Sequence, residues 1–353
     1  MSTESLNRSE LLRSSKIRLA VGGVIRALLI VFAFLGAPHA RRIIVTPPSL
    51  NDLYPVWRGS QELLVHRRSP YSMEVSRDIQ RAFYGAELGP GKHPDQECCF
   101  AYPLYVSFLL APAVNSDIVT LQLPALLFLA LLTAASVVCW HKVIRRDARE
   151  LFFVVPLILI SPPVMQGLDL RQSAMLVAAL LAVSAVLADS HHFTLSGVAL
   201  ALATIRPQMC ILAISWMLLW AASGWATRKN LVLGFATAMA VLVGASEILL
   251  PGWIWQFLAQ LRYYRNFAGA SMLELLYGRN IGLALTAIFG CTLLWVMWRR
   301  RSASNFVPML AYVLAVGVAF IPGLKSLLNL VLLIPAMFIL LSRYPMQFGA
   351  DTP

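Results

Sequence analysis

Long uncharged apolar runs are the feature of this sequence that most restricts its fold. Several approach or exceed the ~20 residues that an α-helix needs to cross a bilayer. Only helices and closed barrels satisfy every backbone polar group in lipid, and these runs are too continuous for barrel strands. The sequence therefore predicts an all-α, polytopic integral membrane protein. The apolar runs cover residues 17–37, 101–114, 118–140, 151–164, 173–188, 195–221, 231–250, 281–298, 306–321 and 327–342.

The composition supports this class and excludes others. Of the 353 residues, 58% are hydrophobic and 13% are charged, and the mean hydropathy is +0.69. Soluble domains carry about 25% charged residues, so a soluble enzyme, a disordered chain and a fibrous protein are excluded. The net charge of +12 resides mostly in short clusters between apolar runs. Such clusters are typical of topology signals, and we expect no nucleic-acid partner.

Counting each apolar run as one crossing gives about ten transmembrane helices with both termini in the cytoplasm. Residues 1–16 are then a cytoplasmic N-terminus, 17–343 a transmembrane domain and 344–353 a cytoplasmic tail. Segments 38–100 and 251–280 are extracytoplasmic loops. We expect a multi-pass protein of a bacterial inner or plasma membrane.

One loop conflicts with this count. Residues 141–150 carry four Lys/Arg residues yet fall outside, against the positive-inside rule. The loop would move to the cytoplasm if the run 195–221, which contains Pro207, were two half-spans and the run 101–114 were re-entrant. The sequence leaves both arrangements open, and both keep residues 228–229 cytoplasmic.

The segment 51–64 carries the first candidate for chemistry. Its apolar residues recur at helical spacing, which predicts an amphipathic helix along the membrane surface. Asp52 stands at the start of this helix. Asp is a favoured N-cap residue, but a carboxylate at the membrane surface is also a candidate general base. Capping does not exclude catalysis, so both interpretations stay open.

Two further candidate sites lie in or beside apolar runs. Arg206 adjoins the helix-breaking Pro207, and an intramembrane charge normally faces a cavity or a partner. A functional cation is the favoured interpretation, against an ion pair or snorkelling to the headgroups. Arg171 and Gln172 follow the same logic, although Arg171 and Asp169 could simply neutralise each other at a helix end.

No pattern for a metal ion or a cofactor is present. The five cysteines contain no C-x-x-C pair, and a disulfide between the neighbours Cys98 and Cys99 would be strained. There is no Gly-x-Gly-x-x-Gly unit and no Walker lysine. We expect no cofactor and assign no metal ligand. A metal would need a second carboxylate near Asp52, for which Glu62, Asp78 and Asp95 are candidates by position alone.

Several motifs occur in the order in which one known family has them. They are Asp52, Tyr54 and Trp57; Pro70-Tyr71; Tyr102-Pro103-Leu104; Ser161-Pro162-Pro163; Arg171-Gln172-Ser173-Ala174; Gly197 to Arg206-Pro207-Gln208; and Asn280-Ile281-Gly282-Leu283. Together they resemble glycosyltransferase family 87, a group of C-type membrane glycosyltransferases that use polyprenyl-phosphate sugars and include mannosyltransferases.

The resemblance implies a fold, a reaction and a set of site residues. The expected fold is that of the C-type glycosyltransferases, with interfacial helices in the first external loop. The expected reaction moves one sugar from a polyprenyl-phosphate donor to a lipid or glycan acceptor of the cell envelope. Mannose is the best-known donor sugar of the family that the sequence resembles. Asp52 matches the family's catalytic Asp and is the expected general base. The expected substrate-binding residues are Tyr54, Trp57, Tyr71, Tyr102, Arg171, Gln172, Arg206, Gln208, Asn280 and Lys325.

The chain also departs from the family pattern. Arg171 replaces a Gly, Ala174 an Asn and Arg206 a Lys, and Lys325 lies where relatives often carry His or aromatic residues. A changed donor or an inactive paralogue therefore remains open. The alternative function is a secondary transporter or lipid flippase without catalysis, but no convincing inverted repeat is present. A structural membrane partner is a third possibility.

Overall fold

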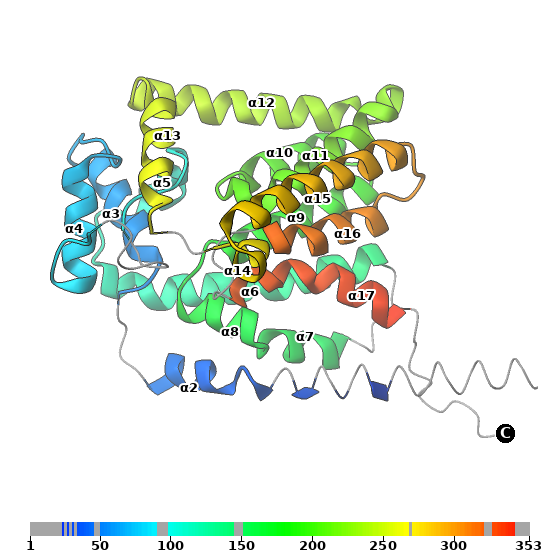
Figure 1. The fold of residues 1–353 in the computed structure, drawn as a ribbon, viewed down its shortest axis with the longest axis horizontal. Coiled ribbons are helices and arrows are strands. Elements are labelled where there is room, and N and C mark those ends of the chain that lie inside the picture. The colour runs from blue at the N-terminus through cyan, green and yellow to red at the C-terminus, as the bar shows by residue number, and fades with distance from the viewer. Residues whose placement is uncertain are drawn as a thin grey trace, which may run out of the picture.

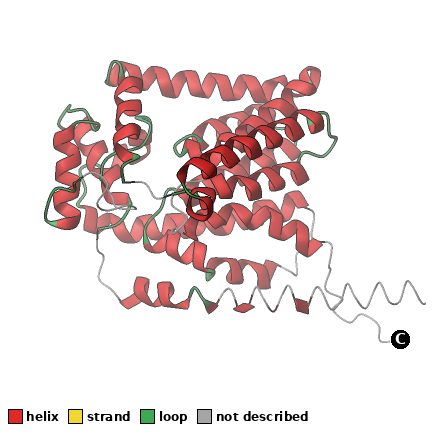
Figure 2. Cartoon of the chain, in the orientation of Figure 1, coloured by secondary structure: helices red, strands yellow, loops and turns green. Residues whose placement is uncertain are grey.

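The computed structural model describes residues 23, 24, 27, 30, 31, 34–45, 50–89, 98–144, 151–267, 270–320 and 327–342. Within these ranges every regular element is a helix (Figure 2), which confirms the predicted all-α class. In chain order the elements are α2 (Ala37–Val45), α3 (Leu53–Leu64), α4 (Met73–Tyr84), α5 (Val106–Leu110), η1 (Ala111–Ala113), α6 (Ile118–Ile144), α7 (Leu151–Leu159), α8 (Pro162–Asp169), α9 (Ala174–Asp189), α10 (Phe193–Ala203), α11 (Pro207–Ser223), α12 (Trp225–Leu249), α13 (Trp253–Tyr264), α14 (Met272–Tyr277), α15 (Arg279–Arg300), α16 (Val307–Gly317), η3 (Val318–Phe320), η4 (Leu327–Leu333) and α17 (Ile334–Ser342).

The helices form a bundle with a smaller helical group at one end. Figure 1 shows α12 along one edge, α2 and α7 along the opposite edge, and α3 and α4 together at one end of α6. Helix α9 packs against both α6 and α10 and is largely buried. The core is therefore centred on α9. Helices α3 and α4 form a small group at one end, and Val56 and Leu63 of α3 belong to the same buried cluster as α9.

Among the described residues, three helices, α6, α12 and α15, are long and apolar enough to cross a membrane. Shorter apolar helices, such as α9 and α11, occupy several of the other predicted runs. The membrane class predicted from composition is supported, whereas the number of ten crossings stays a prediction.

Two predicted runs do not form continuous helices. The run 195–221 divides into α10 and α11, because Pro207 fits the first turn of a helix while the residue before it leaves helical geometry. That residue, Arg206, has φ −129° and ψ 79°. The run 101–114 contains only the short α5 and η1. Both breaks match the arrangement in which the loop 141–150 faces the cytoplasm, which remains a prediction.

Helices α10 and α12 approach each other closely through glycine. A Cβ atom on Gly197 would overlap the carbonyl oxygen of Leu231, and one on Gly234 would overlap that of Thr194. Small residues at helix contacts allow this close approach of backbones in membrane proteins.

A Gly197→Val substitution is expected to push α10 away from α12 and to destabilise the fold. Overpacking of this kind costs about 1–3 kcal/mol or more. Thermal unfolding in detergent measures the effect. The matched control is Gly244→Val in α12, since nothing lies within 4 Å of a Cβ atom built there. Equal melting temperatures for the two variants would contradict the close contact.

The amphipathic helix predicted for residues 51–64 is present as α3. Its buried face includes Val56, Trp57 and Leu63. The next helix, α4, begins at Met73, and its N-cap residue Ser72 accepts a side-chain hydrogen bond from the amide of Val75. These two helices pack against each other and form a helical unit within the predicted first external segment.

Hydrogen bonds between side chains join the two segments predicted to be extracytoplasmic. On α13, Gln256 accepts from Ser69 at 2.6 Å, and Gln260 donates to Ser76 at 3.0 Å. The Gln80 amide donates to the Tyr263 hydroxyl at 3.1 Å. Since residues so far apart in the chain meet along one contact, the two segments lie at the same end of the molecule (Figure 1).

The predicted cytoplasmic residues 228–229 lie beside a second basic cluster, Arg299 to Arg301 at the end of α15. The Arg228 guanidinium donates to the Trp220 carbonyl oxygen and stacks on the Trp220 ring at 3.9 Å. The Ser223 hydroxyl donates to the carbonyl oxygen of Arg301 at 2.6 Å. The end of α15 and the α11–α12 turn are therefore adjacent, so the two basic clusters lie on the same side of the molecule.

Candidate functional site

Asp52 occupies the N-cap position of α3, but its side chain makes no capping hydrogen bond. Instead, the amide of Leu53 donates to Oδ1 of Asn51 at 3.2 Å. The Asp52 amide donates to the carbonyl oxygen of Leu170, also at 3.2 Å. The half-buried Asp52 carboxylate is therefore not the helix cap. Its backbone is bonded to the turn that joins α8 to α9.

Arg171 organises that turn. Its backbone has a left-handed φ of 51°. Its guanidinium donates to the carbonyl oxygens of Asp169 at 2.7 Å, Leu168 at 3.1 Å and Gln122 at 3.4 Å. The Asp169 carboxylate makes an ion pair with Arg42 at 3.4 Å. Arg171 thus holds the carbonyl end of α8 against α6, close to the point where α3 is bonded.

Unpaired polar atoms follow Arg171 at the start of α9. Gln172 is 5% exposed, and its Oε1 has no hydrogen-bond partner among the described residues. The Ser173 hydroxyl is at the N-cap position of α9 and is likewise buried without a partner there. Buried polar atoms usually have partners, so this turn can accept hydrogen bonds from a ligand or from water.

A second group of predicted site residues surrounds the start of α11. The Arg206 guanidinium carbon lies 5.8 Å from the centroid of the Tyr102 ring, within cation–π range. The Tyr71 hydroxyl donates to the Tyr102 carbonyl oxygen at 2.8 Å. Burial raises the pKa of Tyr71, so its hydroxyl remains a neutral hydrogen-bond donor. Tyr105 bonds to Thr204 at 2.8 Å and fixes the same loop to the end of α10.

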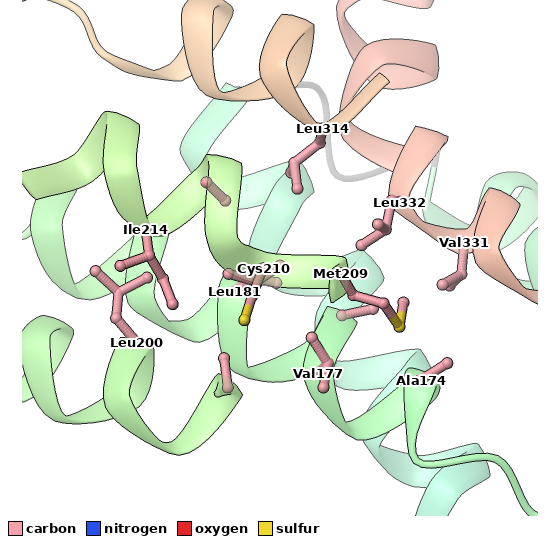
Figure 3. Close-up of a cluster of buried hydrophobic side chains, with 14 of the residues drawn as sticks. Ala174, Val177, Leu181, Leu200, Met209, Cys210, Ile214, Leu314, Val331 and Leu332 are labelled. Atoms are coloured by element: carbon pink, nitrogen blue, oxygen red, sulfur yellow. The ribbon is translucent and has the colours of Figure 1, made fainter. Parts of the chain in front are cut away.

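The two groups are connected through the core. Figure 3 shows Met209, in the first turn of α11, beside Ala174 and Val177 at the start of α9. Helices α9 and α11 therefore begin close together. The positive end of a helix dipole lies at its N-terminus, which makes such a pair of helix starts suitable for an anion.

The remaining predicted site residues have other environments. The Tyr54 ring packs 5.8 Å from Trp57 and 5.6 Å from Phe83, measured between ring centroids, and burial raises its pKa. The Trp57 Nε1 is buried without a hydrogen-bond partner among the described residues. Gln208 and Asn280 are exposed. Lys325 lies outside the described residues.

Two of the three other candidate carboxylates of this segment, Glu62 and Asp78, form ion pairs with arginines. Glu62 is fully buried and pairs with Arg58 at 2.9 Å and with Arg68 at 2.6 Å. Asp78 pairs with the same Arg58 at 3.2 Å. Both carboxylates are therefore paired with arginines, and Asp95 lies outside the described residues. No cluster of three His, Cys, Asp or Glu residues suited to a metal occurs in the described part of the chain.

Sequence reasoning missed two residues at the site, Asn51 and Gln122. The Asn51 side-chain amide donates to Oε1 of Gln122 at 2.6 Å, and both residues are buried. Gln122 stands in the apolar run that became α6. A lone amide in a membrane span was the signal that could have identified it.

A large apolar cavity lies next to these helices. Its volume is about 640 Å³, and its lining comes from the first apolar run, α7, the start of α8, η4 and α17. Helix α8 joins this cavity to the Asp52 contact, since Pro163 and Val164 line the cavity and Leu170 follows the end of the helix. Eight residues of α-helix span about 12 Å.

The comparisons with known proteins agree with this architecture. The sequence profile of glycosyltransferase family 87 matches residues 100–340, more than half of the chain. The protein therefore belongs to glycosyltransferase family 87 and is a membrane glycosyltransferase by family. No curated protein and no solved structure matches the chain. The matched range includes Arg171, Gln172 and Arg206 but begins after Asp52.

Proposed function

We propose that the protein transfers one sugar from a polyprenyl-phosphate donor to a lipid or glycan acceptor on the extracytoplasmic side of the membrane. The observation that carries the proposal is the bond between the Asp52 amide and Leu170. It joins a carboxylate to one end of α8, while the other end of the same helix lines an apolar cavity. A donor with a long apolar tail and a polar head needs this combination.

Asp52 is the general base of the proposed reaction. It takes the proton of the acceptor hydroxyl as the hydroxyl oxygen attacks the anomeric carbon. The bond between the anomeric carbon and the phosphate oxygen breaks, and its electron pair stays with the polyprenyl phosphate. One direct displacement inverts the configuration at the anomeric carbon. The product is the glycosylated acceptor, and polyprenyl phosphate leaves.

The departing phosphate gains negative charge and is stabilised between the starts of α9 and α11. Arg206, at the N-cap position of α11, supplies a cation there. A cation at the positive end of a helix is unfavourable by itself, at about 0.3–1 kcal/mol. An anion bound at this point interacts favourably with both charges. In this account Gln172 and Tyr71 contact the head of the donor, and Arg171 maintains the turn between α8 and α9.

The cavity receives the polyprenyl chain. Ala336 lines this cavity, and the larger side chain of an Ala336→Trp variant would fill part of it. This variant is expected to raise KM about tenfold or more for a long-chain polyprenyl-phosphate mannose, since each CH₂ excluded from apolar surroundings costs about 0.8 kcal/mol. A short-chain donor should be affected much less. Ala240→Trp, on the exposed face of α12, is the control. The assignment would be contradicted if Ala336→Trp changed the KM for the long-chain and the short-chain donor by the same factor relative to wild type.

The proposed function is tested with the purified full-length chain in lipid nanodiscs. A panel of polyprenyl-phosphate mannose, glucose and galactose is incubated with a total membrane-lipid extract as acceptor, and released polyprenyl phosphate is quantified. We expect one donor to be consumed with equimolar release. Failure of the whole panel, together with uptake of a labelled solute into proteoliposomes, would support the transporter alternative. Mannose is the first donor to test because of the family's known members.

A further inference from the structure

We infer that Gln122, a buried glutamine of α6, is a positioning residue that holds the proposed general base. This inference rests on the proposed role of Asp52. Gln122 is 3% exposed, and its Oε1 accepts a 2.6 Å hydrogen bond from Nδ2 of the equally buried Asn51. The residue after Asn51 is Asp52, so this hydrogen bond lies one peptide unit from the carboxylate.

Asn51 uses both ends of its side-chain amide. Its Oδ1 accepts from the Leu53 amide and caps the start of α3, while its Nδ2 reaches α6. Because one planar amide group makes both bonds, the first turn of α3 cannot rotate without breaking one of them. Asp52 lies between these two bonded points.

Gln122 also contacts the other support of Asp52. Its backbone carbonyl oxygen accepts a hydrogen bond from Nε of Arg171 at 3.4 Å. Arg171 in turn holds the turn whose Leu170 carbonyl accepts from the Asp52 amide. A single residue of α6 therefore fixes both the start of α3 and the turn between α8 and α9.

Gln122 is expected to affect the location of the Asp52 carboxylate rather than the binding of substrate. A general base must lie within hydrogen-bond reach of the proton that it removes, and a displacement of about 1 Å can cost about 10²-fold in rate. Gln122 contacts neither substrate in this account. Its loss should therefore lower kcat and leave the KM for the donor nearly unchanged.

The test replaces Gln122 by Met, which is similar in length and retains the backbone carbonyl that Arg171 uses. The probe is the polyprenyl-phosphate sugar that the wild-type chain consumes, with the full-length protein in nanodiscs. We expect kcat to fall about 10- to 100-fold, with the donor KM within about threefold. The matched control is Gln260→Met, which removes an equally buried glutamine (4% exposed) and its hydrogen bond to Ser76. It should keep kcat within about threefold, because that bond lies between α4 and α13.

A double-mutant cycle with Asn51→Ala separates positioning from general damage. Because the two side chains act through one bond, the double variant should be about as slow as the slower single variant. The inference would be overturned if the losses of kcat in the two single variants multiplied in the double variant. It would also be overturned if Gln122→Met kept kcat within about threefold of wild type.

The amide exchange of residues 52–54 gives a readout that does not need turnover. We expect faster exchange in Gln122→Met than in Gln260→Met, and equal exchange would count against the tether. The two proposals fail differently. Full activity of an Asp52→Asn variant removes the general base, whereas an inactive Asp52→Asn variant beside a fully active Gln122→Met variant removes only the tether.

Discussion

Replacing Asp52 by Asn is expected to reduce kcat about 10³-fold, since general base catalysis typically contributes 10²–10⁴-fold. Asn keeps the size of the side chain but cannot accept the proton of the acceptor hydroxyl. The side chain makes no capping hydrogen bond, and the backbone bond to Leu170 does not depend on it. Folding should therefore be preserved. Release of polyprenyl phosphate from the purified variant measures the loss, and thermal unfolding measures the fold.

Asp117→Asn is the matched control for this experiment. Asp117 is exposed before α6, and its Oδ1 accepts a hydrogen bond from the Val119 amide at 3.3 Å. Asn makes the same cap, so the control should keep full activity. Wild-type kcat in the Asp52→Asn variant would remove Asp52 from the mechanism.

Removing the Arg206 charge is expected to have the second largest effect. Arg206→Gln should lower kcat about 10²- to 10³-fold, because one preorganised donor to a developing negative charge is worth about that much. Arg206→Lys should retain a large share of the activity, since it keeps the cation. Lys is also the residue that the family motif resembled by Gly197–Gln208 usually has there. Stability should not fall with activity, because a cation at the start of α11 opposes the helix dipole.

Arg228→Gln controls for the loss of packing. Arg228 also lies over an aromatic ring, that of Trp220 at 3.9 Å, but at the opposite end of α11. Its replacement should change kcat less than threefold, as expected for a site with no shared partners. Equal losses in Arg206→Gln and Arg228→Gln would mean that the charge at 206 has no specific role in catalysis.

The sequence predicted the class of fold because hydropathy dominates the energetics of a membrane chain. It also predicted α3, since the spacing of Val56, Trp57 and Leu63 is helical. It left the break at Pro207 open, as one of two arrangements of the run 195–221. It did not predict how the runs divide. The lengths of α7 and α8, and the short α5, depend on packing between helices rather than on local hydropathy.

The candidate site was predicted in part. Asp52, Arg171 and Arg206 stood out as charges in or beside apolar segments, and the contacts of Asp52 and Arg171 at one turn give the first two a shared location. The use of Asn51 as the helix cap and the Asn51–Gln122 bond were not foreseen, because a hydrogen bond over that distance in the chain leaves no periodic pattern. Asn280 and Gln208, selected by resemblance alone, are exposed.

A structure with a non-hydrolysable polyprenyl-phosphonate mannose tests the central claim most directly. The account predicts the prenyl chain in the cavity beside α8 and the phosphonate between the starts of α9 and α11. The anomeric carbon should lie where one acceptor hydroxyl can reach both it and Asp52, at about 3 Å from each. A phosphonate bound beside Arg301 at the opposite end of the helices, remote from Asp52, would contradict the account.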